Sequence, residues 1–308
     1  MTTLLFTHPA CIEHDPGPHH PERPDRLRAV VDALEHEDFS ALDRRIAPLG
    51  SVEAIERVHA PRYVQEILNS VPDHGYVNLD PDTVMSPQSG EAALRSVGGA
   101  IAAIDAVMDG ADNAFVAVRP PGHHAERDRA MGFCFFNTVA VAAEHARVAH
   151  GLSRIAVIDF DVHHGNGTQH MFEGEAGLFY GSSHQWPCYP GTGMAHEKGV
   201  AGNIANLQLA PGAGSLEFRR GMPDQVLEPL RMFRPEFLII SAGFDAHERD
   251  PLAQLNLMTD DYRWITDELV AIADDVCGGR IVSCLEGGYD LDALAEGSAA
   301  HVRSLLAA

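Results

Sequence analysis

The chain has 308 residues, of which 45% are hydrophobic, and 44 acidic residues against 22 basic ones give it a formal net charge of −22. The hydrophobic fraction is ordinary for a globular protein with a sizeable core. An acidic surface repels a phosphate backbone, so we expect no nucleic-acid partner, although it would attract a cationic substrate. No apolar run approaches the 18 residues that indicate a membrane-spanning helix, so we expect no membrane partner either.

The cysteines and the N-terminal residues bear on the cellular compartment. Five cysteines without a C-x-x-C pair argue against a disulfide framework or a four-cysteine zinc site, and they fit a reducing cytoplasm. Residues 1–8 lack the basic and apolar regions of a secretory signal, and we expect a short first strand there. No repeat or linker divides the sequence, so we expect residues 1–308 to form a single domain.

Helical patterns and short apolar runs alternate after this first strand. In chain order they predict a helix over 21–34, a helix over 91–108, a strand over 114–118, a helix over 137–149, strands over 155–158 and 178–180, a helix over 216–232, a strand over 237–240, a helix over 260–276, a strand over 280–285 and a helix over 291–306. Short continuous apolar strands that alternate with helices indicate a mostly parallel sheet covered on both faces.

Polar, glycine-rich segments follow four of the predicted strands. They are residues 119–126 (RPPGHHAE), 159–167 (DFDVHHGNG), 241–251 (SAGFDAHERDP) and 286–290 (EGGYD). Ligands of open α/β sheets bind at the carboxyl ends of the strands. We therefore expect the four segments to converge on one crevice, although they are far apart in the sequence.

Asp161 and His163 are the first candidate metal ligands. We expect them to continue a strand, where side chains two positions apart point the same way and can face one ion. The third ligand must come from another strand end. Asp245 is the best placed, and His247 is a weaker alternative by the same spacing. Two carboxylates and one histidine leave coordination positions open, as in catalytic rather than structural zinc sites.

Two neighbours of these ligands are expected to support them. His164 points to the opposite face of the expected strand from His163, so we expect it to form hydrogen bonds within the scaffold. Asp159 shares the face of Asp161 and is expected to lie behind the ligands. The D-x-H spacing alone is common, and it gains weight here because three other polar strand ends accompany it.

Several motifs in the same order resemble the histone deacetylase superfamily. They run from about residue 20 to residue 290 and comprise residues 20–24 (HPERP), 119–124 (RPPGHH), 132–137 (GFCFFN), 159–167 (DFDVHHGNG), 189–193 (YPGTG), 241–245 (SAGFD) and 285–289 (LEGGY). The likeness is greatest to the class II branch and its bacterial deacetylase-like amidohydrolases, partly because Asn166 stands where class I enzymes carry aspartate.

The resemblance implies a deacetylase-type catalytic domain with an arginase-like three-layer α/β/α fold and a mostly parallel central sheet. The implied reaction is hydrolysis of an acylated amine, such as acyl-lysine, and the implied cofactor is one zinc ion held by Asp161, His163 and Asp245. The resemblance also implies a structural potassium ion. Its ligands would come from Asp159, Ser182 and backbone groups of Asp161, His163 and Ser183.

The resemblance also assigns roles to the remaining site residues. His124 would be the general base and then the proton donor to the leaving amine, while His123, oriented by Asp159, would act mainly through its charge. Tyr289 would donate a hydrogen bond to the developing oxyanion. By the same resemblance, Asn166 would complete the catalytic set, and the substrate tunnel would be formed by Gly132, Phe133, Tyr189, Leu252 and Gly287.

Three competing functions stay open at this point. A two-manganese ureohydrolase of the same fold needs D-x-H-x-D and D-x-D, but here Gly165 and His247 occupy the last positions, which disfavours it. A catalytically weak acyl-amine binding protein is the second possibility, although every catalytic position holds a competent residue. The third is an acetylpolyamine deacetylase. Leu252 follows Asp250-Pro251 where the polyamine-selective branch carries a glutamate, which argues against a strict polyamine preference.

Overall fold

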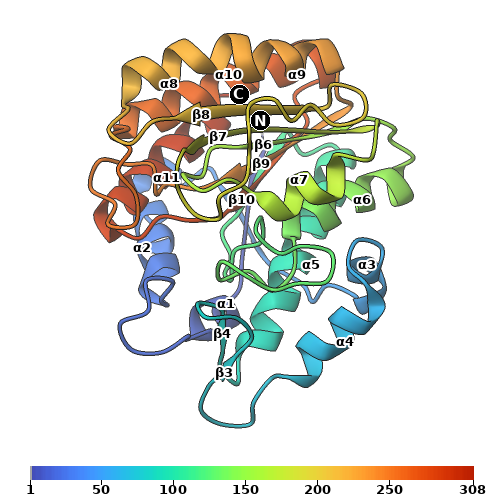
Figure 1. Ribbon diagram of the computed structural model, residues 1–308, viewed down its shortest axis with the longest axis vertical. Coiled ribbons are helices and arrows are strands. Elements are labelled where there is room, and N and C mark those ends of the chain that lie inside the picture. The colour runs from blue at the N-terminus through green and yellow to red at the C-terminus, as the bar shows by residue number, and fades with distance from the viewer. Residues whose placement is uncertain (1) are drawn as a thin grey trace.

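The computed structural model describes residues 2–308, and a central eight-stranded sheet organises them (Figure 1). The strand order is β2-β1-β5-β10-β9-β6-β7-β8, and every neighbouring pair is parallel. The strands are β1(Thr3–Thr7), β2(Asp43–Ile46), β5(Asn113–Val116), β6(Ile155–Asp159), β7(Leu178–Gln185), β8(Ile204–Leu209), β9(Phe237–Ala242) and β10(Ile281–Leu285). A separate antiparallel pair is formed by β3(Val77–Asn78) and β4(Val84–Met85).

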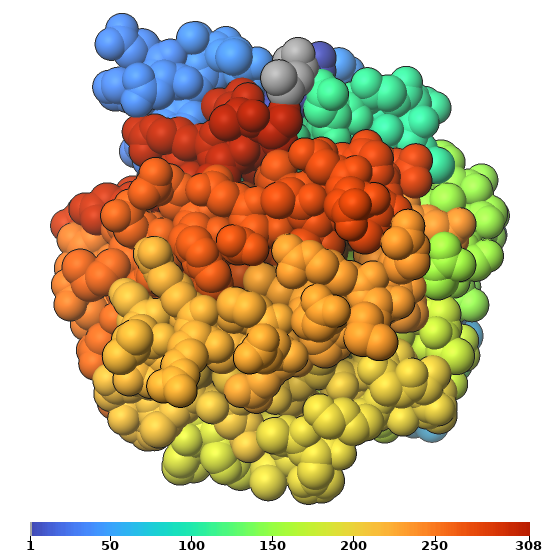
Figure 2. Space-filling view, turned by 90° about the horizontal axis from the view of Figure 1, so that it is seen from above, coloured from blue at the N-terminus to red at the C-terminus, as the bar shows by residue number. Residues whose placement is uncertain are grey.

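Helices cover both faces of this sheet, which makes the three-layer α/β/α fold that the sequence predicts (Figure 1). On one face lie α5(Ser89–Met108) and α6(Thr138–His150), with α1(Pro9–Glu13), α3(Val52–Glu56), α4(Pro61–Asn69) and α7(Asn166–Phe172) nearby. The other face carries α2(Asp25–Leu34), α8(Ser215–Met222), α9(Glu228–Phe233), α10(Thr259–Cys277) and α11(Leu291–Ala307). Figure 2 looks onto this second layer, where α10, α11 and α2 follow one another as orange, red and blue bands. None of the helices among residues 2–308 is long and apolar enough to span a membrane.

The predicted strands are confirmed, and their composition explains why they could be found. Every residue of β6 and of β9 is buried, as expected for parallel strands that helices cover on both faces. The sequence pattern missed two strands at the sheet edges. The edge strand β2 reads DRRI and is mostly exposed, and β8 reads IANLQL with polar residues between the apolar ones. Neither sequence contains a continuous apolar run.

The predicted helices are also present, with shifts that local chemistry explains. The Asn137 side chain caps α6 by accepting a hydrogen bond from the Ala140 amide, and Gly151 ends this helix in the left-handed region with φ 67°. The helix predicted over 216–232 is present, but it is not a regular α-helix throughout. It consists of α8, a π-helical segment η2(Pro223–Leu227) and α9 in direct succession, because Pro223 and Pro229 lack the amide hydrogen that a regular helix needs.

A buried ionic network ties α2 to the carboxyl edge of the sheet. The Glu22 carboxylate lies between two arginines, with 2.9 Å to Arg26 Nη1 and 2.7 Å to Arg119 Nη2, and all three side chains are fully buried. Arg26 also donates to the backbone carbonyl groups of Glu286 and Gly288. The chain that follows β10 is therefore held in place by α2.

We predict that Glu22→Ala lowers the free energy of unfolding by roughly 3–5 kcal/mol, because it leaves two guanidinium groups buried without their partner. Denaturant titration of the purified variant measures this loss. Glu53→Ala is the matched control, since it removes an exposed carboxylate that pairs with Arg57 across one helical turn and should cost no more than about 0.5 kcal/mol. Equal stability of the two variants would contradict the assigned importance of the network.

Candidate active site

The four polar segments converge as the sequence predicts, because the strands that precede them are neighbours in the sheet. The strands β5, β10, β9 and β6 lie side by side, so their carboxyl ends meet along one edge. Backbone hydrogen bonds join the segments there. The Gly287 amide donates to Asp161 Oδ2 over 2.8 Å, and the Val162 amide donates to Asp245 Oδ1 over 2.8 Å.

Asp161, His163 and Asp245 form a buried cluster in which three potential metal-ligand atoms lie within 4.8 Å of one another. His163 Nδ1 is 3.2 Å from Asp161 Oδ1 and 3.1 Å from Asp245 Oδ2. The expectation that residues 161–163 continue a strand is wrong, because β6 ends at Asp159 and the chain then bends. The bend is held by the His163 amide, which donates to Asp161 Oδ1 over 2.9 Å.

Two carboxylates buried side by side give this cluster a strong affinity for positive charge. Burial and then the charge of Asp161 raise the pKa of Asp245 to about 7. Burial acts the same way on Asp161, but His123 and His163 outweigh it and hold the pKa of that carboxyl below its usual range. A divalent cation would compensate both charges, and carboxylate and imidazole groups are ligands that zinc accepts.

The tandem histidines beside this cluster have different partners. His123 Nδ1 is 2.9 Å from the Asp159 carboxylate, whereas His124 Nδ1 is 2.8 Å from the amide oxygen of Asn166. The Asn166 amide nitrogen is engaged elsewhere, since it donates to Glu126 Oε1 over 2.8 Å. Its oxygen therefore faces His124, which places the proton of a neutral His124 on Nδ1 and leaves Nε2 as an acceptor.

The same partners separate the pKa values of the two imidazoles. Burial lowers the pKa of His123, but the charges of Asp159 and Asp161 outweigh it and raise the value to about 10. Burial, followed by the charges of His123 and His163, lowers the pKa of His124 well below its usual range. These opposite shifts favour the cationic form of the first histidine and the neutral form of the second.

A cavity of 210 Å³ opens beside the cluster. Every residue that the resemblance assigned to the tunnel lines this cavity. Gly132 and Gly287 are required by close approach, since a Cβ at Gly132 would collide with the His124 ring and one at Gly287 with the carboxylates of Asp161 and Asp245. The cavity is lined by Asp82, Pro121, His123, His124, Gly132, Phe133, His163, Tyr189, Leu252, Gly287 and Tyr289.

Tyr289 reaches this cavity because Gly288 adopts φ 124°, a conformation that side chains rarely allow. Its amide donates to Asp250 Oδ2 over 2.7 Å, and the Arg26 guanidinium lies over its ring at 4.8 Å from the centroid. Burial raises the pKa of the Tyr289 hydroxyl well above its usual range. The hydroxyl stays protonated at neutral pH and can donate a hydrogen bond.

The two other histidines considered in the sequence, His164 and His247, both lie outside the carboxylate–histidine cluster. His164 forms hydrogen bonds with Thr192 and Gln169, which confirms its expected place in the scaffold. His247 contacts Thr259 and stacks on the Tyr262 ring, so it is not part of the carboxylate–histidine cluster.

The residues assigned to potassium lie behind the cluster. Asp159 and Ser182 are register partners in β6 and β7, and both are fully buried together with Ser183. The Asp159 carboxylate accepts hydrogen bonds from His123, from the Tyr180 hydroxyl over 3.0 Å and from the Asp161 amide over 3.1 Å.

Two acidic residues of the site were missed in the sequence. Glu286 Oε2 accepts hydrogen bonds from the Gly122 and His123 amides, and its Oε1 accepts one from the Ser241 hydroxyl. Asp82 lines the cavity and accepts from the Gly132 amide over 3.2 Å. The position of Glu286 directly after a buried strand was a usable signal, whereas Asp82 lies outside all four polar segments.

Comparison with known proteins agrees with this geometry. The histone deacetylase domain family matches residues 20–305. A histone deacetylase-like amidohydrolase of Pseudomonas aeruginosa is 38% identical over 93% of this chain and 81% of its own, and a probable deacetylase of Archaeoglobus fulgidus is 36% identical over 95% and 82%. The crystal structure of the HDA15 HD domain covers 99% of this chain and 88% of its own, with a TM-score of 0.93 and 33% identity.

These matches span nearly the whole chain and place the protein among the deacetylases and amidohydrolases. It belongs to the histone deacetylase family.

We predict that Asp161→Ala and Asp245→Ala each abolish retention of zinc, because a three-ligand site cannot spare one ligand. The measurement is the metal content per chain after dialysis that removes loosely bound ions, where the wild type should retain one zinc. His247→Ala is the control and should retain the ion. Full zinc retention in Asp245→Ala would show that another residue is the third ligand.

Proposed function

We propose that the protein is a zinc-dependent amidohydrolase that removes an acyl group, most simply acetyl, from an amine such as acyl-lysine. The observation that carries the proposal is the difference between the tandem histidines. His124 is held by Asn166 with its Nε2 free, His123 is paired with Asp159, and their surroundings shift the two pKa values in opposite directions beside one buried carboxylate–histidine cluster. A pair of groups whose pKa values are pushed apart in this way indicates acid–base chemistry.

Asp161, His163 and Asp245 fit a zinc ion, because they place two buried carboxylates and an imidazole around one point. Bound there, zinc would lower the pKa of a water molecule and polarise the amide carbonyl. We also propose that a structural potassium ion is held at Asp159 and Ser182, with backbone groups of Asp161, His163 and Ser183. Such an ion would offset the charge of the Asp159 carboxylate behind His123.

Four side chains of the site then have separate roles in the reaction. His124 Nε2 takes a proton from the attacking water and delivers it to the leaving amine. Asn166 holds His124 in the tautomer that this requires. His123, hydrogen-bonded to Asp159, lies beside the cluster and stabilises the negative charge that develops nearby. Tyr289 donates a hydrogen bond from its hydroxyl group to the former carbonyl oxygen.

The cavity supports a slender acyl-amine substrate. Phe133 and Tyr289 meet edge to face with 5.9 Å between ring centroids, and Tyr189 meets the His124 ring at 5.2 Å. These aromatic rings line the 210 Å³ cavity beside the cluster, and we propose that a linear amide enters it. Leu252 lines the same cavity and brings no charge to it, so we favour acyl-lysine or neutral acyl amides over acetylpolyamines, which stay the alternative substrate class.

The geometry argues against a two-metal ureohydrolase and against a protein that only binds acyl amines. A second metal ion would need a further ligand beside Asp161 or Asp245, but Gly165 offers no side chain and His247 stacks on Tyr262. A pure binding protein would have no use for a neutral His124 held in a defined tautomer. Turnover of an acetyl-lysine reporter peptide distinguishes such a protein from an enzyme.

We predict that Tyr289→Phe lowers kcat by roughly 10²–10³, because one oxyanion donor is lost. KM should change less than kcat, since the hydroxyl acts mainly in the transition state. The measurement is steady-state hydrolysis of an acetyl-lysine peptide by wild-type and variant protein of equal zinc content. A variant with nearly the wild-type kcat would show that Tyr289 only lines the cavity and does not stabilise the transition state.

We predict that wild-type protein hydrolyses acetyl-lysine peptides at least as well as acetylspermidine, and that Leu252→Glu shifts the ratio of the two kcat/KM values toward the polyamine by about threefold or more. The added carboxylate attracts the second amine of a polyamine. Leu252→Gln is the matched neutral control and should shift the ratio little. A strong wild-type preference for acetylpolyamines would contradict the proposed substrate class.

A further inference from the structure

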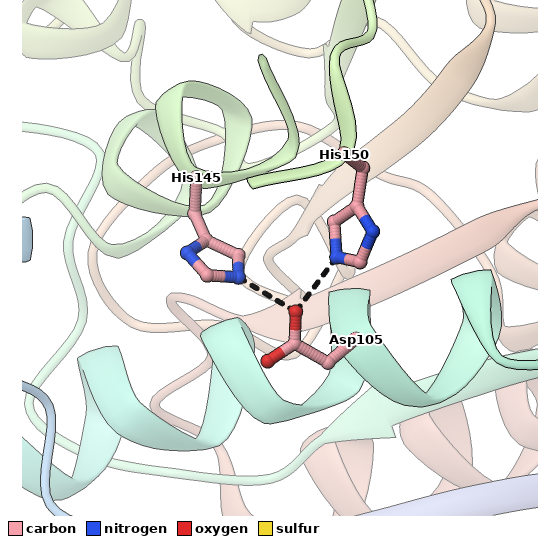
Figure 3. Close-up of side chains that lie close together, drawn as sticks. All are labelled: Asp105, His145 and His150. Carbon is pink, nitrogen blue, oxygen red and sulfur yellow. Dashed lines mark hydrogen bonds and ion pairs between the residues drawn. The ribbon is translucent and has the colours of Figure 1, made fainter. Parts of the chain in front are cut away.

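A second cluster of metal-ligand type lies far from the candidate active site, between α5 and α6. Asp105 of α5 faces two histidines of α6, His145 and His150, and Asp105 Oδ1 is 2.7 Å from Nε2 of each ring (Figure 3). Residues 2–308 hold only two groups of three or more acidic, histidine or cysteine side chains whose ligand atoms lie within 4.8 Å of one another, and this is the one outside the active site. Its chemistry is used by no step of the proposed reaction.

The helix α6 leads from the active-site segments to the second cluster, since its cap residue Asn137 donates to the Ala125 carbonyl next to His124. This helix begins at Thr138, next to its cap Asn137, and ends at His150. Its 13 residues of α-helix span about 20 Å. The second cluster therefore lies near the opposite edge of the sheet, where the chain enters β6 at Ile155.

We propose that Asp105, His145 and His150 form a second, exchangeable zinc site. Two imidazole nitrogens and one carboxylate oxygen are ligands that zinc prefers, and three protein ligands leave a fourth position for water. Figure 3 shows the two rings approaching the carboxylate from different sides, so their Nε2 atoms already point at one place. The function of the ion would be to link α5 to the end of α6.

The present spacing requires only a small adjustment to admit an ion. The atoms of a tetrahedral zinc site with bonds of 2.0–2.1 Å are about 3.3 Å apart, compared with the 2.7 Å of the two hydrogen bonds. Asp105 can move by this amount because its side chain is 46% exposed. Both histidines are less exposed, at 14% and 21%, so their rings are held in place.

The surroundings also favour a cation at this place. His150 is the last residue of α6, where the backbone carbonyl groups carry partial negative charge. A surface hollow of 420 Å³ adjoins the cluster and is lined by Asp105 and His145, together with Arg57, whose charge is paired with Glu53. The hollow gives an ion and its water a path from solvent. Partial exposure and a single carboxylate make this ion easier to remove than one in the buried active site, where two carboxylates are present.

The test is zinc binding to intact protein whose active site is already loaded. Wild-type protein, His145→Gln/His150→Gln and the control His74→Gln, which changes an exposed histidine elsewhere, are dialysed and then titrated with Zn²⁺ alone. We expect wild type and the control to take up one more zinc per chain than the double variant. The added ion should raise Tm by roughly 4 °C at a hundredfold excess over Kd, and only where both histidines are present.

Asp105→Asn separates a metal site from a simple hydrogen-bonded clamp, because it keeps an oxygen acceptor for the histidines and removes the charge. We expect zinc affinity to fall at least tenfold while Tm without zinc stays close to wild type. Equal zinc uptake by wild type and the double variant, or unchanged affinity in Asp105→Asn, would overturn the proposal. Asp245→Ala should lose only the active-site ion, so the fate of this proposal does not depend on that of the proposed function.

Discussion

The burial of two neighbouring carboxylates, Asp161 and Asp245, is the constraint on which the rest of the active site depends. Their charges are tolerable at the carboxyl edge of the sheet only because donors and cations surround them. The Gly287 and Val162 amides donate to their oxygens, and His163 lies between them. The space for this arrangement comes from Gly287, where any side chain would collide with both carboxylates.

The tandem histidines extend the same electrostatic arrangement outward. Asp159 and Asp161 raise the pKa of His123, and a positive charge on His123 lowers the pKa of His124. Replacing the carboxamide of Asn166 with a carboxylate would weaken this contrast, since a negative partner would favour a protonated His124. One amide group therefore sets which histidine can accept a proton.

The segment that follows β10 matters both for the stability of the fold and for the position of Tyr289. Glu22, Arg26 and Arg119 are buried as a network, and Arg26 binds the Glu286 and Gly288 carbonyl groups while covering the Tyr289 ring. Buried ion pairs cost desolvation energy and gain little net stability over apolar packing. Their value here is geometric, since they fix the turn from which Tyr289 enters the cavity.

The sequence by itself determined the parallel α/β class, the strands that carry the site and the identity of its polar segments. Buried parallel strands such as β6 and β9 are continuous apolar runs, and the ligands follow them directly, so local patterns were sufficient. The same patterns missed β2 and β8, because polar residues interrupt their apolar runs. Only the pairing with neighbouring strands identifies these two segments as strands.

Only the tertiary structure decided how these segments meet. The bend after Asp159 replaced the expected strand, because the buried carboxylates draw the amides of Val162 and His163 toward them. The places of Asp82 at the cavity and of Asp105 beside two histidines of another helix depend on contacts between distant parts of the chain. Residues brought together across the fold share no local spacing, so the physical reason for their roles appears only when the chain is packed.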